Sequence, residues 1–144
     1  MVKEIGDVRY EVIVMPLEDY KKANNPEWQS DGNENDYIYV KLRLRNNKSD
    51  VDMIKWNVVD ESEYQKRLQF FNNEIASATH IAYEDQQYYA LESIYENNYG
   101  MSPNIDVVMV FRNPQPKESI KHSNLRFVFE DRVFTKQILK FRIN

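Results

Sequence analysis

Apolar and polar positions alternate along several segments of the chain, and this alternation predicts β-strands. The clearest case is residues 37–45 (YIYVKLRLR), in which every second side chain from Ile38 to Leu44 is aliphatic. Residues 8–15 (VRYEVIVM) show the same period of two. Residues 105–111 (IDVVMVF) are apolar on nearly both faces, which predicts a strand at the centre of a sheet or between two layers.

Other apolar segments extend the predicted sheets. We predict a second long strand at residues 51–60 (VDMIKWNVVD), with Ile54, Trp56 and Val58 on its inward face. Residues 125–143 contain two more runs, LRFVFE and VFTKQILKFRI, separated by Asp-Arg. These two runs are expected to pair as a terminal hairpin.

One short amphipathic helix is expected between the strands. Residues 62–65 (SEYQ) have the S-x-x-Q form of a capping box. After it, apolar residues recur at helical spacing at Tyr64, Leu68, Phe71 and Ile75. Residues 74–83 (EIASATHIAY) either prolong this helix or form a strand, and the alternation of larger and smaller residues favours a strand.

Strands at short intervals, turns of Asn, Asp and Pro, and one helix together predict a β-sandwich. The length of 144 residues suits a single domain, spanning residues 1–144, with a long exposed loop at about residues 17–36. The expected core is one contiguous cluster of Ile38, Val40, Leu42, Leu44, Trp56, Val107, Met109, Phe111, Phe127, Phe129, Leu139 and Phe141.

Part of the chain resembles the small immunoglobulin-like domains of secreted bacterial lipoproteins and cell-surface proteins. Residues 37–47 (YIYVKLRLRNN) are similar to the opening V-x-V-x-V-x-N strand of those domains, and residues 56–60 (WNVVD) stand in the place of the second strand. Residues 102–111 (SPNIDVVMVF), 113–116 (NPQP) and 125–143 are similar to the proline-containing loop, the strand ending in phenylalanine and the closing strands.

The resemblance implies an all-β fold, namely an immunoglobulin-like antiparallel β-sandwich with one short helical insertion at residues 62–71. It also implies a non-enzymatic binding or structural module of a bacterial envelope or surface protein, recognising a protein or a glycan. No catalytic residue follows from it. The expected location is extracytoplasmic, in the periplasm or at the cell surface, and such proteins can carry a lipid anchor upstream of the domain.

Composition narrows the class of partner. The net charge of −4 gives no overall positive field, so we expect no nucleic-acid partner. No apolar run approaches the roughly 20 residues of a membrane-spanning helix. The first ten residues, MVKEIGDVRY, lack the apolar region of a signal peptide. The chain has no cysteine, which excludes disulfides and thiol chemistry.

The sequence lacks the motifs of several enzyme classes. Its three glycines are far apart, so neither a P-loop nor a Rossmann turn can form. There is no G-x-S-x-G motif, and His80 and His122 are interpreted as ordinary half-exposed histidines. Residues 30–36 (SDGNEND) place their glycine too early for an EF-hand loop. We expect no cofactor, no metal site and no enzymatic activity.

The best candidate for a recognition surface is the stretch at residues 83–99 (YEDQQYYALESIYENNY), in which tyrosines interleave with acids and no Lys or Arg occurs. Aromatic faces beside carboxylates suit sugar rings or a basic protein surface. The candidate binding residues are Tyr83, Tyr88, Tyr89, Tyr95, Tyr99, Glu92 and Glu96. A loop whose tyrosines cover the edge of the sandwich explains the same pattern, and we favour that interpretation.

A carbohydrate-active hydrolase is the alternative function. It would use two acids between Glu84 and Glu96, facing one another across a cleft at about 5–10 Å.

Basic residues also share strand faces, at Lys41, Arg43 and Arg45 and at Lys136, Lys140 and Arg142. Paired strands would join the two groups into a positive patch, although a solvated sheet face is the favoured interpretation.

Overall fold

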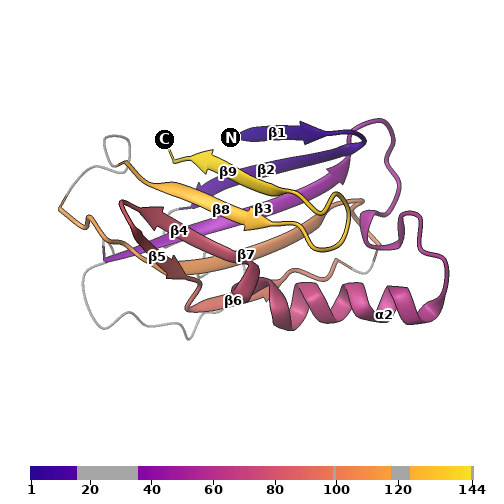
Figure 1. The fold of residues 1–144 in the computed structure, drawn as a ribbon. Coiled ribbons are helices and arrows are strands. Elements are labelled where there is room, and N and C mark those ends of the chain that lie inside the picture. Colours follow the sequence, from indigo (N-terminus) through magenta and orange to yellow (C-terminus); the bar gives the residue numbers. More distant parts are fainter. Residues whose placement is uncertain (16–35, 99, 118–123, 144) are drawn as a thin grey trace.

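The chain folds into two antiparallel β-sheets with one helix beside them (Figure 1). The computed structural model describes residues 1–15, 36–98, 100–117 and 124–143. The five-stranded sheet has the order β1-β2-β3-β7-β6, and the four-stranded sheet has the order β5-β4-β8-β9. Apart from Asp36, the loop expected at residues 17–36 lies outside the described residues.

The strands of the five-stranded sheet are β1 (Val2–Ile5), β2 (Val8–Met15), β3 (Tyr37–Asn46), β6 (Glu92–Tyr95) and β7 (Ile105–Arg112). Those of the four-stranded sheet are β4 (Thr79–Tyr83), β5 (Gln86–Tyr89), β8 (Arg126–Glu130) and β9 (Ile138–Arg142). Between β3 and β4 the chain forms a 3₁₀ turn (Met53–Lys55), helix α2 (Glu61–Gln69), a π-helical turn (Phe70–Glu74) and a second 3₁₀ turn (Ile75–Ala78).

The strand order is that of an immunoglobulin-like fold. With β1 set aside, β2, β3, β7 and β6 take the places of strands A, B, E and D in one sheet. In the other sheet β5, β4, β8 and β9 take the places of C′, C, F and G. The expected class, an all-β immunoglobulin-like antiparallel β-sandwich with one short helical insertion, is therefore confirmed.

Strand β1 is an addition that the sequence pattern did not predict. It pairs with β2 from Val2 opposite Glu11 to Ile5 opposite Val8. The turn between them begins at Gly6, whose φ of +57° is a conformation that residues with a Cβ rarely adopt. As a result β2 lies one strand in from the edge of its sheet.

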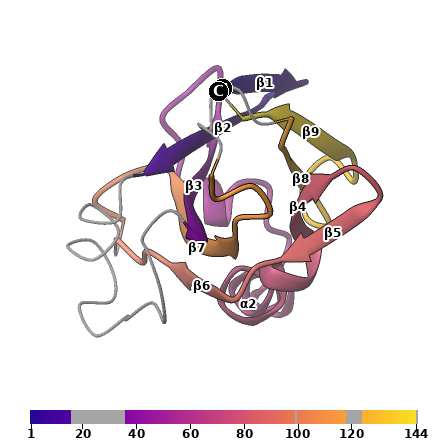
Figure 2. The same cartoon turned by 90° about the vertical axis from the view of Figure 1, so that its left-hand side faces the viewer.

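A single apolar core lies between the two sheets. It contains every residue of the expected cluster except Trp56, which is half-buried and packs against the core from outside. Viewed along the strands, α2 lies beside β6 at one open side of the sandwich (Figure 2). The core also includes Phe71 and Ile75, so the turns that follow α2 complete it on this side.

The outer face of β3 and β7 is less polar than the sequence pattern indicated. Tyr37, Tyr39, Val108 and Val110 form a second buried cluster, separate from the main core. The expected placement of residues 105–111 at the centre of a sheet is confirmed, because β7 lies between β3 and β6 and is buried on both faces.

The strand predicted at residues 51–60 is wrong. Met53–Lys55 forms a 3₁₀ turn, and successive local hydrogen bonds, such as Trp56 N–H to the Met53 carbonyl at 3.2 Å, take the place of strand pairing. Asn57 then adopts a left-handed φ of +56°, which interrupts an extended chain. Val58 is half-buried, so no continuous inward face forms here.

The helix begins slightly earlier than predicted. Asp60 is its N-cap and accepts a hydrogen bond from the Glu63 N–H at 2.8 Å, while the Glu63 carboxylate accepts one from the Val59 N–H at 3.3 Å. Asp60 and Glu63 therefore cap the helix, in place of the capping box predicted at residues 62–65. Among the residues that the structure describes, no helix has the length and apolar character needed to cross a membrane.

The predictions for residues 74–83 and for the terminal hairpin are correct in part. Of residues 74–83, only the second half is a strand, as β4, because residues 75–78 form a 3₁₀ turn first. The terminal hairpin is confirmed as β8 and β9. Residues 131–137, however, form the connection between these strands rather than the start of the second one.

Phe129 and Trp56, which were both predicted in one core, differ sharply in how far they are buried. Replacing Phe129 by alanine should lower the free energy of unfolding by about 3–5 kcal/mol, because this ring is fully buried. Trp56→Ala should lower it by only about 1–2 kcal/mol, because the half-buried indole loses less contact area. Urea denaturation followed by circular dichroism measures both values, and equal losses would contradict the edge position of Trp56.

Candidate functional site

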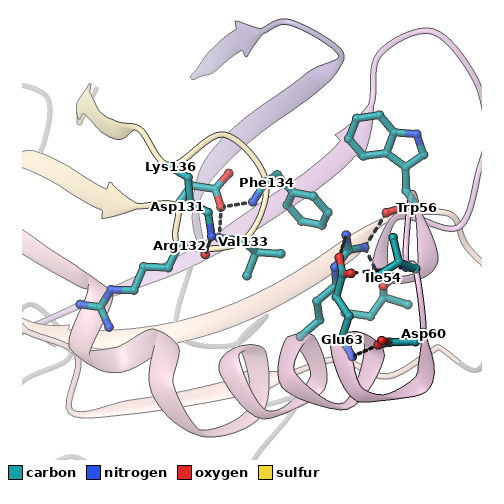
Figure 3. Close-up of polar contacts among 11 residues, drawn as sticks. Ile54, Trp56, Asp60, Glu63, Asp131, Arg132, Val133, Phe134 and Lys136 are labelled. Carbon is teal, nitrogen blue, oxygen red and sulfur yellow. Dashed lines mark hydrogen bonds and ion pairs between the residues drawn. The ribbon is translucent and has the colours of Figure 1, made fainter.

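A groove of about 520 Å³ lies between α2 and the β8–β9 connection (Figure 3). Four cationic side chains line it, and we call it the basic groove: Lys66, Arg67, Arg132 and Lys136. Two acids, Glu63 and Glu74, and the apolar side chains of Phe70 and Val133 also line it.

The β8–β9 connection owes its shape to the buried carboxylate of Asp131. One carboxylate oxygen accepts hydrogen bonds from the backbone N–H groups of Val133 and Phe134, both at 2.8 Å. The other accepts from the Thr135 N–H at 3.1 Å and the Thr135 hydroxyl at 3.2 Å. Short Asp side chains commonly bond the backbone just ahead of them in this way, which fixes the turn that presents Arg132 and Lys136 to the groove.

Tyr10 on β2 supplies a further donor to Asp131 from the opposite sheet. Its hydroxyl bonds to the Asp131 carboxylate and lies 2.7 Å from the Thr135 hydroxyl. Burial, reinforced by the hydrogen bond to Asp131, raises the pKa of Tyr10 above its ordinary value. The connection is thus fastened to the sandwich through a neutral phenol and a carboxylate.

Arg67 fastens the other wall of the groove. Its guanidinium donates to the Trp56 carbonyl at 2.6 Å, to the Ile54 carbonyl at 3.2 Å and to the Glu63 carboxylate at 3.1 Å. It also lies 4.9 Å from the ring centroid of Phe134, within cation–π range. Desolvation lowers the pKa of Arg67, and the neighbouring Glu63 opposes that shift. Arg67 therefore holds α2, the 53–56 turn and the β8–β9 connection together.

Phe134 in the β8–β9 connection packs against aromatic rings of neighbouring elements. The Phe134 ring centroid lies 6.1 Å from that of Trp56 and 6.4 Å from that of Phe71. Phe71 in turn makes an edge-to-face contact with Tyr95 at 6.1 Å. Through these contacts the β8–β9 connection packs on the core residue Phe71.

The electrostatic character of the groove is positive. Glu63 is engaged by Arg67, and Arg132 pairs with Glu130 at 3.2 Å on the rim. The Lys66 side chain forms no hydrogen bond or ion pair with any described residue. A ligand with carboxylate, phosphate or sulfate groups fits this arrangement, because it would find exposed donors beside apolar surface.

The tyrosine-rich stretch forms two edge strands, so the expected loop is wrong, although several of its tyrosines pack at the edge of the sandwich as expected. Gln86–Tyr89 is β5 at the edge of the four-stranded sheet, and Glu92–Tyr95 is β6 at the edge of the five-stranded sheet. The candidate binding residues are thus divided between two sheets. Tyr99 lies outside the described residues.

Most of these tyrosines are engaged in packing. Tyr83, Tyr88 and Tyr95 are half-buried and contact the core, while Tyr89 is 49% exposed. Burial, with smaller contributions from the nearby Asp52 and Tyr64, raises the pKa of Tyr95 to about 12. Tyr89 lies 5.3 Å from the His80 ring on the outer face of the four-stranded sheet.

The acids of the stretch are likewise spread over the molecule. Glu84 and Asp85 form the exposed turn between β4 and β5, whereas Glu92 begins β6 in the other sheet. Glu96 follows β6 and forms an ion pair with Lys41 at 3.1 Å. The structure does not bring Glu84 and Glu96 together, and no observation favours the hydrolase alternative.

The other candidates from the sequence also lie apart. His80 is half-buried on β4, and desolvation with the nearby charge of Lys140 lowers its pKa. His122 and most of residues 30–36 lie outside the described residues. Within residues 1–15, 36–98, 100–117 and 124–143, no cluster of His, Asp and Glu has the arrangement of a metal site.

The two basic strand faces do not combine. β3 and β9 belong to different sheets, so Lys41 and Arg43 do not join Lys140. Instead, Arg43 forms a two-pronged ion pair with Asp106, with nitrogen–oxygen distances of 2.8 and 3.1 Å.

Sequence reasoning missed the basic groove because its cations come from a helix and a hairpin connection that are distant along the chain. The one local signal is Asp131 followed by Val133 and Thr135, a spacing typical of an Asp-capped turn.

Comparisons of the chain with protein-family models, with curated proteins and with solved structures give no match.

Asp131 should be the residue whose loss most damages the groove. Asp131→Ala leaves three backbone N–H groups without their acceptor and should lower the free energy of unfolding by about 3 kcal/mol or more. Thr135→Val, which removes a single hydroxyl, is the matched control and should cost about 1 kcal/mol. Urea denaturation measures both, and similar losses would show that Asp131 does not organise the connection.

The raised pKa of Tyr10 predicts a pH dependence. Folding favours the protonated hydroxyl, so this stabilisation is complete below pH about 10 and is lost above it, where the unfolded tyrosine ionises. Wild-type protein should therefore exceed Tyr10→Phe in stability at pH about 8, and the difference should shrink by pH about 11. Unfolding free energies of both proteins at the two pH values test this expectation. A difference that stays constant would place the Tyr10 hydroxyl outside the network.

Proposed function

We propose that the chain is a non-enzymatic binding module of a bacterial envelope or surface protein, and that its basic groove recognises an acidic segment of a partner protein. The observation that carries the proposal is the charge of the groove. Four cations and two acids line it, although the chain as a whole has a net charge of −4.

The groove combines two properties that peptide recognition uses. Phe70 and Val133 offer apolar surface, and Lys66 offers a cation without a competing partner in the described part of the chain. Acidic peptides that also carry apolar residues match this combination, since desolvated contacts supply affinity and charge pairs supply orientation. The envelope location rests on the resemblance of residues 37–143 to surface domains, and a glycan ligand is the other outcome to test.

Charge reversal in the groove tests the function. A fluorescein-labelled decapeptide of alternating glutamate and leucine should bind the wild-type protein, and Lys66→Glu with Lys136→Glu should weaken binding at least about tenfold. The affinity should also fall as salt is raised, because exposed charge pairs are screened. Fluorescence anisotropy measures both effects.

The control is the double variant Arg45→Glu with Lys117→Glu, which changes the net charge equally on exposed residues outside the groove. It should retain wild-type affinity. Equal weakening by both double variants would mean non-specific attraction and contradict the assignment of the groove. If neutral and acidic glycans from a glycan array bind and the peptide does not, the ligand is a sugar and not an acidic segment of a protein.

A further inference from the structure

A second pocket lies where β8 begins and β9 ends, at the opposite end of the β8–β9 hairpin from the basic groove. Figure 1 shows these two strand ends on the far side from the β8–β9 connection. The volume of the pocket is about 580 Å³, and its lining is mostly polar. We call it the arginine pocket, and its lining residues are Tyr83, Glu84, Gln115, Asn124, Arg126 and Arg142.

Two arginines stand directly opposite one another in this pocket. Arg126 on β8 and Arg142 on β9 are register partners, and both are exposed on the outer face of the four-stranded sheet. Like charges at directly opposed positions destabilise a sheet. Neither guanidinium forms a hydrogen bond or ion pair with any described residue, whereas Arg43 is held by Asp106. Within the described part of the chain, two positive charges thus lie side by side without an ion-pair partner.

Residues next to the two arginines leave open space beside their side chains. Ala82 is the register partner of Arg126 on its other side, and its methyl group leaves the outer face open there. Gln115 also lines the pocket and donates from Nε2 to the Tyr83 hydroxyl at 2.9 Å. Its Oε1 is buried, and no group in the described part of the chain donates to it. Among the described residues, Gln115 therefore brings a buried acceptor without a donor to the lining of a pocket that also holds two guanidiniums without an acceptor.

These groups together specify the chemistry of a ligand. Two planar guanidiniums suit a carboxylate or a sulfate, which accept paired hydrogen bonds. The oxygens of Glu84, Gln115 and Asn124 suit hydroxyl donors. A bare inorganic anion would satisfy the arginines but would also meet the negative charge of Glu84.

We propose that the arginine pocket is a binding site for an acidic sugar, with a carboxylate or sulfate held by Arg126 and Arg142 and ring hydroxyls bonded to Gln115 and Glu84. The site is separate from the basic groove, so this proposal stands or falls independently of the peptide-binding function.

The test is a titration of ¹⁵N-labelled protein, followed by NMR, with D-glucuronate, glucose 6-sulfate, glucose and sodium sulfate. The two charged sugars should give saturable shifts at β8, β9 and the arginine side chains. Glucose and free sulfate should bind at least about tenfold more weakly, because glucose lacks an anionic group for the arginines and free sulfate lacks ring hydroxyls for Gln115 and Glu84.

Substitutions of the two arginines test whether the charged sugars bind in this pocket. Arg126→Gln and Arg142→Gln should each weaken binding of the charged sugars at least about tenfold, while Arg45→Gln, an exposed arginine on β3, should not. Arg142→Gln should keep or raise the melting temperature, since it removes a repulsion rather than a contact. The groove variant Lys66→Glu with Lys136→Glu should bind the sugars normally.

Absence of saturable binding by both charged sugars would overturn the proposal. So would unchanged affinity in the two pocket variants. Sulfate binding as tightly as glucose 6-sulfate would show a simple anion site and overturn the assignment to a sugar.

Discussion

The structure depends most on one buried carboxylate. Asp131 is fully buried, and it is stable there because three backbone N–H groups of one turn, a hydroxyl and a phenol donate to it. A buried charge without such partners would be strongly unfavourable. The interaction converts a hairpin connection into a fixed surface, and the position of Phe134 follows from it. Phe134 then provides the ring against which Arg67 and Trp56 pack.

The outer faces of the two sheets differ in how far they are buried and in whether their cations are paired. The face of β3 and β7 contains a buried apolar cluster, and its basic residues Lys41 and Arg43 are paired with acids. The face of β8 and β9 carries exposed cations without partners among the described residues. Both pockets that we assign to ligands lie along this hairpin, one at each end.

Sequence periodicity was sufficient for the strands whose inward side chains alternate strictly, such as β3, and for the buried strand β7. It failed at residues 51–60, because Asn57 and local hydrogen bonds turn an apolar segment away from extended structure. It also failed for the tyrosine stretch, where short edge strands carry polar residues that resemble a loop. Neither pocket was predicted, because the basic groove combines α2 with the β8–β9 connection, and the arginine pocket combines β4, β8 and β9 with Gln115 and Asn124; these segments come together only in the folded chain.

The bond between Tyr10 and Asp131 joins residues 121 positions apart. Contacts of such long sequence separation are costly in chain entropy and make folding slow. We therefore expect the core strands to assemble early and the β8–β9 connection to reach its final shape only after both ends of the chain have docked. On a ribosome, the groove would be completed only once the last strand has emerged, so recognition would begin after synthesis of the domain has ended.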